Sequence, residues 1–143
     1  MMMAHTVNYL SVLIAAVAAW LFGGVYYTAL SKVWMAAQGK TPEQCQAEMA
    51  AKSGVAKGAP FIIVFSGEFI MAWALYGILV HLNAFTLRGG VISGALIWFG
   101  FVLPTVTSNY AFHGRKPMLT VIDSAAWLGA LLIIGAIVGG MGR

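Results

Sequence analysis

Four long apolar stretches alternate with shorter polar segments along the chain. They cover about residues 7–30, 60–82, 89–112 and 117–140. A helix that crosses the hydrocarbon core of a bilayer needs about 20 predominantly apolar residues. Loops and strands with open edges would leave backbone N–H and C=O groups unpaired in lipid. Each stretch is therefore predicted to be a transmembrane helix.

The composition agrees with a membrane protein. Of the 143 residues, 61% are hydrophobic and only 8% are charged, whereas soluble domains have about 25% charged residues. A soluble protein of this length cannot bury so much apolar surface. We therefore predict an all-α fold: a single polytopic domain, residues 1–143, with four transmembrane helices. The lipid bilayer is its first expected partner, and a net charge of +4 from scattered residues does not indicate nucleic acid.

The first link, residues 31–59, is the only sizeable polar segment, and it contains the signals of a short helix. Thr41 is a typical N-cap residue, Pro42 suits the first helical position, and the Gln44 side chain can reach back to the Thr41 N–H. The pattern predicts one short polar surface helix that ends near Lys52.

Three prolines affect the predicted membrane helices. Pro60 and Pro117 suit first-turn positions of the second and fourth helices, where a missing N–H removes no helical hydrogen bond. Pro104 lies inside the third helix and cannot donate to the carbonyl of Gly100. The sequence therefore predicts a kink in the third helix.

Positive charge is concentrated in two of the links. With four membrane crossings, residues 31–59 and 113–117 lie on one side, whereas the termini and residues 81–88 lie on the other. The side with residues 31–59 and 113–117 has six basic residues: Lys32, Lys40, Lys52, Lys57, Arg115 and Lys116. The other side has two, Arg88 and Arg143. Because cytoplasmic loops are enriched in Lys and Arg, we expect the two basic links in the cytoplasm and both termini outside. The expected location is the bacterial inner membrane.

Small residues recur at four-residue spacing in three of the predicted helices. Such spacing lets helix backbones approach closely in lipid, where contacts between apolar side chains gain little. The predicted helix-packing positions are Ala15, Ala19, Gly23, Gly90, Gly94, Gly135 and Gly139. We interpret them first as contacts within the protein's own bundle, and a dimer contact is the alternative.

Two acidic residues lie inside predicted membrane helices. Glu68 is eight residues beyond Pro60 and Asp123 is six residues beyond Pro117, which places them about 12 Å and 9 Å deep from the same basic side. An ionised and unpaired acid at this depth is costly, so both should turn inward and meet in one polar network. Its other expected members are Asn109, Tyr26, Tyr27, Arg115 and Lys116.

Two interpretations of this network remain open. In the first, the network is structural, and Asp123 pairs with Arg115 to fix the helix register. In the second, the network is a site for a proton, a cation or a small polar ligand, and it opens to the cytoplasm. Ionisable groups inside a membrane are functional hypotheses by default.

No sequence pattern points to catalysis or to a resident cofactor. Nucleotide-binding loops, nucleophile elbows and HExxH motifs are absent, so we do not expect an enzyme. The single cysteine, Cys45, can form neither an internal disulfide nor a thiol-based metal site. His5, His81 and His113 are expected at different membrane levels, so no metal site is predicted.

These features favour a non-enzymatic integral membrane protein that works by association, as a homo-oligomer or as an accessory subunit of a larger membrane complex. The small size, the outward-facing apolar helices and the absence of a reaction motif support this hypothesis. The alternative is a small proton- or cation-linked transporter or channel in which Glu68 and Asp123 are the coupling acids.

Two segments carry a resemblance to a known family: "VNYLSVLIAAVAAWLFGGVYYTALSKVWMAAQG" and "GFVLP…NYAFHGRKPMLTVIDSAAW". Its marks are Asn8, the turn from Gly23 to Tyr27, Trp34 with Gly39, Gly100-Phe101, and the stretch from Arg115 to Asp123. The chain resembles a family of small four-span membrane proteins from bacteria and fungi that is classed only as a domain of unknown function. Relatives tend to have a Trp-Tyr pair where this chain has Tyr26-Tyr27. The resemblance implies the four-helix architecture and no particular activity.

Overall fold

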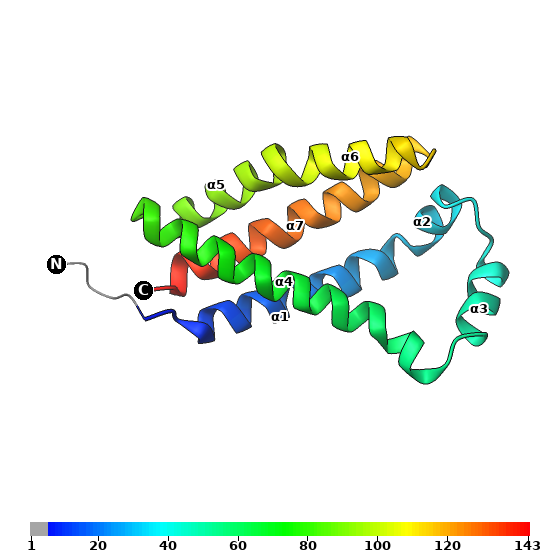
Figure 1. The fold of residues 1–143 in the computed structure, drawn as a ribbon, viewed down its shortest axis with the longest axis horizontal. Coiled ribbons are helices and arrows are strands. Elements are labelled where there is room, and N and C mark those ends of the chain that lie inside the picture. Colours follow the sequence, from blue (N-terminus) through cyan, green and yellow to red (C-terminus); the bar gives the residue numbers. More distant parts are fainter. Residues whose placement is uncertain (1–5) are drawn as a thin grey trace.

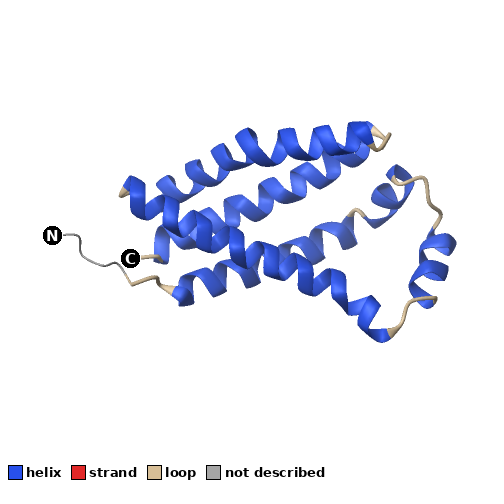
Figure 2. Ribbon diagram, viewed as in Figure 1, coloured by secondary structure: helices blue, strands red, loops and turns tan. Residues whose placement is uncertain are grey.

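Helices account for nearly all of the structure, a computed structural model that describes residues 6–143 (Figures 1 and 2). The elements are α1 (Tyr9–Ala29), α2 (Ser31–Ala37), α3 (Pro42–Ala50), α4 (Gly54–Leu82), α5 (Leu87–Ile97), the π-helical turn η1 (Trp98–Val102), α6 (Leu103–Phe112) and α7 (Pro117–Met141). Four stretches are long and apolar enough to cross a membrane: α1, α4, Leu87–Phe112 and α7. The predicted all-α fold with four transmembrane helices is confirmed, and these helices indicate an integral membrane protein.

α7 is the central helix, and it packs against α1, α4 and α5. Half of its most apolar window is buried, a larger share than in any of the other three spans. The main core lies toward the end of the bundle that holds the chain termini, and its buried members are Val12, Ala15, Ala19, Ala72, Leu75, Tyr76, Leu79, Ala130, Ile134 and Val138. At this end the Asn8 side chain accepts from the Ser11 N–H and donates to the Met141 carbonyl, which connects the first helix to the last.

The two ends of the bundle differ in their links. The start of α1 and the end of α7 lie at one end, whereas α3 and the turn between α6 and α7 lie at the opposite end (Figure 1). The two basic links of the sequence therefore share one end of the bundle. This follows from four antiparallel helices, since every second link returns to the same side.

α4 buries residues against the bundle only along its second half, and its first half meets α1 at Trp20, whose indole N–H donates to the Phe61 carbonyl at 3.2 Å. Its buried residues, Glu68, Ala72, Leu75, Tyr76 and Leu79, recur at three- and four-residue steps and form one helical face. No residue from 54 to 67 is buried, and this half of α4 diverges from α1 in Figure 1. Glu68 is therefore the first buried residue of α4.

The predicted place of Pro60 is wrong, because α4 begins at Gly54. Pro60 is the seventh residue of the helix, so its missing N–H leaves the carbonyl of Ala56 without a helical partner. Ala56 is exposed, and water or headgroups can satisfy its carbonyl there. Polarity ended the predicted span near residue 60, but the helix itself continues into the polar link.

The predicted surface helix is confirmed as α3. The Thr41 hydroxyl accepts from the Gln44 N–H at 3.2 Å, and the Gln44 side chain accepts from the Thr41 N–H at 2.9 Å. These two hydrogen bonds form a capping box with Pro42 in the first turn. No residue of α3 is buried, so the helix adds no core contact.

The third span contains a π-helical turn just before Pro104. In this turn the N–H of Leu103 donates to the carbonyl of Trp98, five residues earlier. Pro104 cannot donate to the carbonyl of Gly100, and a wider turn accommodates that missing hydrogen bond. The disruption that the sequence predicted at Pro104 is therefore a π-turn between α5 and α6.

Glycines bring α5 and α7 into backbone contact. A Cβ atom at Gly90 or at Gly135 would overlap the backbone of the other residue, and a Cβ at Gly94 or Gly139 would meet the carbonyl oxygens of Leu131 or Thr86. In α1, Ala15 and Ala19 are fully buried. These six positions lie in contacts within the bundle. Gly23 does not, because a Cβ there would meet nothing within 4 Å.

Candidate functional site

Asp123 is the centre of a polar network at the basic end of the bundle. It lies in the second turn of α7 and is only 8% exposed. Its Oδ1 accepts hydrogen bonds from the Tyr27 hydroxyl at 2.7 Å and from the Trp34 indole N–H at 3.2 Å. Its Oδ2 accepts from the Tyr110 hydroxyl at 2.7 Å. The three donors come from α1, α2 and α6, so one carboxyl group connects four helices.

Backbone carbonyls of α7 next to Asp123 extend the network. The Tyr26 hydroxyl donates to the carbonyl of Ile122 at 2.7 Å, and the Trp98 indole donates to that of Ser124 at 2.7 Å. Aromatic side chains therefore supply most of the donors around this part of α7. Tyr27 also packs edge-on against Trp34, with ring centroids 5.5 Å apart, so the donors support each other's positions.

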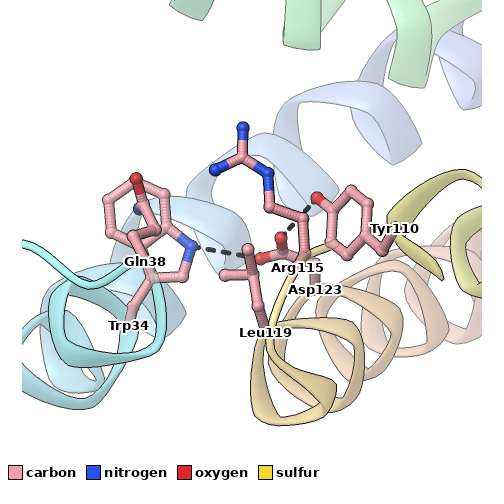
Figure 3. Close-up of a pocket in the computed structure, with 6 residues that line it drawn as sticks. All are labelled: Trp34, Gln38, Tyr110, Arg115, Leu119 and Asp123. Carbon is pink, nitrogen blue, oxygen red and sulfur yellow. Dashed lines mark hydrogen bonds between the residues drawn. The ribbon is translucent and has the colours of Figure 1, made fainter. Parts of the chain in front are cut away.

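Three predicted members of the network donate no hydrogen bond to Asp123 in the described structure. Arg115 and Asn109 are exposed, and Lys116 donates to the carbonyl of Ala36 at 3.3 Å. Within residues 6–143 the ion pair found is Lys40–Glu48, so the predicted Asp123–Arg115 pair is wrong. Three uncharged donors already reach the carboxyl group, and Figure 3 shows the Arg115 guanidinium turned away from it.

Two residues of the network were not predicted. They are Trp34 and Tyr110, and the prediction contained Asn109, the neighbour of Tyr110, instead. The sequence does contain a signal for both, because Tyr and Trp combine a large apolar ring with one hydrogen-bond donor. Such residues near a buried acid at the end of a membrane helix are natural partners for it.

Glu68 lies in a different setting from Asp123. It is 3% exposed on the core face of α4, and its Oε2 is buried without a hydrogen-bond partner in the described structure. No hydrogen bond or ion pair joins it to Asp123 in residues 6–143. The predicted single network of two acids is therefore wrong: Asp123 accepts three hydrogen bonds, and Glu68 has an unpaired oxygen.

A pocket of about 170 Å³ opens beside Asp123. Its lining residues come from α2, α6, the following turn and α7, and they are Trp34, Gln38, Tyr110, Arg115, Leu119 and Asp123 (Figure 3). The Gln38 Nε2 atom is buried and has no hydrogen-bond partner in the described part of the chain. The pocket therefore combines a carboxylate, a guanidinium, an amide donor and aromatic rings.

The described residues contain no group of three His, Cys, Asp or Glu side chains that could hold a metal ion. His81 and His113 each contact the carbonyl four residues earlier in their own helix, Gly77 and Asn109 respectively. The third histidine considered in the sequence, His5, lies outside the described residues. Neither described histidine faces the pocket, whose polar groups suit an organic ligand better than a metal ion.

Comparison with known proteins gives one match. Searches of curated proteins and of solved structures find no match to this chain. The model of the family described as "Protein of unknown function (DUF1761)" matches residues 10–139. This range covers the four membrane helices except Tyr9 and the last two residues of α7, and it includes every residue of the Asp123 network. The chain therefore belongs to the DUF1761 family of proteins of unknown function.

Proposed function

We propose that this protein is a non-enzymatic membrane protein that acts by association, as a homo-oligomer or as an accessory subunit of a larger membrane complex. One observation supports this proposal above the others: the first half of α4 is apolar but has no buried residue. Phe61, Ile62 and Ile63 are 56%, 68% and 69% exposed. Because consecutive helical residues point about 100° apart, this exposure covers most of the circumference of α4.

Association would give this half of α4 the packing that the second half already has. Contacts between helices in a membrane depend on close packing and on polar groups rather than on hydrophobic burial. The second half of α4 buries one face against its own bundle. The first half contacts Trp20 of α1 through Phe61 and Phe65 but buries no residue. A second copy or another subunit at this surface is the occupant that the proposal requires.

We also propose that the end with α3 and the α6–α7 turn faces the cytoplasm, with both termini outside, in the bacterial inner membrane. Six of the eight basic residues belong to the links at that end. The positive-inside rule assigns such links to the cytoplasm. In this orientation the diverging half of α4 lies in the cytoplasmic leaflet.

Cysteine cross-linking in native membranes tests the association. A Cys45→Ser chain removes the single native cysteine, and one cysteine is then placed at Ile63 on α4. The matched control is a cysteine at Leu96 on α5, which is also strongly exposed, at 64%. We expect the Ile63→Cys chain to cross-link to a second copy or to one defined membrane subunit, and the Leu96→Cys chain to cross-link much less. Equal or absent cross-linking at the two positions would contradict the proposal.

Glu68 favours a second candidate function, a small proton- or cation-linked transporter or channel. A buried acid in a membrane helix normally has a partner, and an unpaired carboxyl oxygen suits the binding of a proton or a cation. Because Asp123 already accepts three hydrogen bonds, this candidate now depends on Glu68 alone.

Proteoliposomes with an internal pH-sensitive dye test this second candidate. Glu68→Gln should abolish a pH-dependent flux and leave the fold intact, because the amide is close in shape to the acid. Asp123→Asn is the matched control and should keep the flux. Wild-type vesicles without any flux above empty vesicles would exclude transport of protons, and loss of flux in Asp123→Asn alone would contradict the assignment to Glu68.

A further inference from the structure

We propose that the pocket beside Asp123 binds a zwitterion with a phosphate and a primary ammonium group, the chemistry of a phosphoethanolamine headgroup. The ligand is either the headgroup of a membrane phospholipid or free O-phosphoethanolamine. This inference does not depend on the association of α4, because the pocket lies on α2, α6 and α7. The pocket is lined by two opposite charges, Arg115 and Asp123, that form no ion pair with each other in residues 6–143.

The two charged groups of the pocket favour a ligand with both signs of charge. Arg115 and Asp123 line the same pocket, but no ion pair joins them in residues 6–143. A simple anion would be attracted by Arg115 and repelled by Asp123. A simple cation would be attracted by Asp123 and repelled by Arg115. A zwitterion of suitable length satisfies both groups, because each end meets the opposite charge.

The anionic end of the ligand is assigned to Arg115 and Gln38. A guanidinium group presents paired N–H donors that match the oxygen atoms of a phosphate. The Gln38 Nε2 atom is a buried donor without a partner, and such atoms normally have an acceptor. A phosphate in the pocket supplies acceptors for both side chains.

The ammonium end is assigned to Asp123 and the rings beside it. Each oxygen of a carboxylate can accept about two hydrogen bonds, and Oδ2 accepts only from Tyr110 among the described residues. Oδ2 can therefore accept one more hydrogen bond from a ligand N–H. Trp34 and Tyr110 also line the pocket, and aromatic rings attract a nearby cation.

The size and place of the pocket suit a headgroup. A volume of about 170 Å³ is well above the roughly 10–15 Å³ that one water molecule needs by the same kind of measure, so the pocket has room for a group of several atoms. The pocket lies where α7 begins and α6 ends, at the basic end of two membrane spans. Lipid phosphates occupy the region outside the hydrocarbon core, so a lipid headgroup reaches this level without leaving the bilayer. Leu119 provides an apolar wall for the adjoining carbon atoms.

Ligand binding to the delipidated full chain in detergent tests the proposal. The probes are short-chain phosphatidylethanolamine, phosphatidylcholine, phosphatidylglycerol and free O-phosphoethanolamine. We expect phosphatidylethanolamine to bind more tightly than the other two lipids, since phosphatidylcholine has no ammonium N–H and phosphatidylglycerol has no cation. If free O-phosphoethanolamine displaces phosphatidylethanolamine at a concentration similar to that of the lipid, the ligand is the soluble compound. If it does not displace the lipid, the ligand is the lipid headgroup.

Two variants and one control assign the binding to the pocket. Arg115→Gln should weaken phosphatidylethanolamine binding by about tenfold or more, because it removes hydrogen bonds to a charged group. Gln38→Leu should also weaken binding, and it should raise the melting temperature because it removes a buried unpaired donor. Lys57→Gln, an exposed residue of the same basic end, should change neither. Equal affinity for the three lipids, or wild-type affinity in both pocket variants, would overturn the proposal.

Discussion

The loss of the Asp123 carboxyl group should uncouple four helices at once. In Asp123→Ala the donors Tyr27, Trp34 and Tyr110 lose their common acceptor, and no other side chain replaces it. In Asp123→Asn the amide oxygen can still accept from Tyr27 and Trp34, and the amide nitrogen can donate to the Tyr110 oxygen. The two substitutions therefore separate the hydrogen bonds from the charge.

The expected magnitude follows from the number of hydrogen bonds. Side-chain hydrogen bonds between membrane helices contribute about 0.6 kcal/mol on average and up to about 1.7 kcal/mol. Three of them together give roughly 2–5 kcal/mol. The three donor residues are only partly buried, and water near the headgroups can replace part of the loss. We therefore expect Asp123→Ala to lower the free energy of unfolding by about 2–3 kcal/mol, and Asp123→Asn by less than about 1 kcal/mol.

Unfolding in mixed micelles by titration with a denaturing detergent measures these differences. Trp34 and Trp98 donate to this part of α7, so two of the five tryptophans that contribute to the fluorescence signal lie in the network. Tyr27→Phe should cost about 1 kcal/mol, whereas the control Tyr9→Phe should cost nothing, because Tyr9 is 60% exposed. Equal stability of Asp123→Ala and Asp123→Asn would refute the assignment of the network as a structural connection.

Three further predictions use other parts of the fold. Gly90→Ala should lower the free energy of unfolding by about 1–3 kcal/mol, since the new methyl group overlaps the backbone of Gly135. The control is Gly67→Ala, where the space is open. A similar loss in both variants would contradict close α5–α7 packing. Glu68→Leu should raise the free energy of unfolding by about 1–3 kcal/mol in the same titration, and a loss would show that Glu68 has a stabilising partner. A reporter enzyme active only outside the cytoplasm, fused after Arg143, should be active, and inactivity would reverse the proposed orientation.

The parts of the fold that local interactions determine could be predicted from the sequence. The four spans follow from length and hydrophobicity, which lipid enforces through the backbone. The capping box of Thr41 and Gln44 also forms within one turn. The helices of the first link, residues 31–59, were harder to predict, because polar residues indicate that a segment lies outside the membrane but not whether it is helical. α2 and the first turns of α4 are helical although they belong to the link between the first two predicted spans.

The inward face of the third span could not be predicted because of the π-turn. A π-turn inserts one residue into a helix, and one residue corresponds to a rotation of about 100°. Every residue after Trp98–Val102 is therefore displaced around the helix axis relative to a regular α-helix. The sequence placed Asn109 in the network, and the structure has its neighbour Tyr110 there. The prediction of Asn109 rested on its polar side chain and its depth, and the π-turn adds to this a rotation that such reasoning does not contain.

The different surroundings of Glu68 and Asp123 also result from helix geometry that residue counting does not reveal. Counting residues from Pro60 gives a depth for Glu68 only if the helix starts at Pro60 and runs beside its neighbours. α4 starts six residues earlier, and its first half diverges from α1 (Figure 1). Donors from α1, α2 and α6 converge on Asp123, but the same divergence keeps α4 out of that network. Asp123 therefore has the contacts of a structural residue, with one acceptor position still free on Oδ2. Glu68 differs, because a buried carboxyl oxygen without a hydrogen-bond partner lowers stability. Stability alone therefore does not explain why an acid is present at position 68.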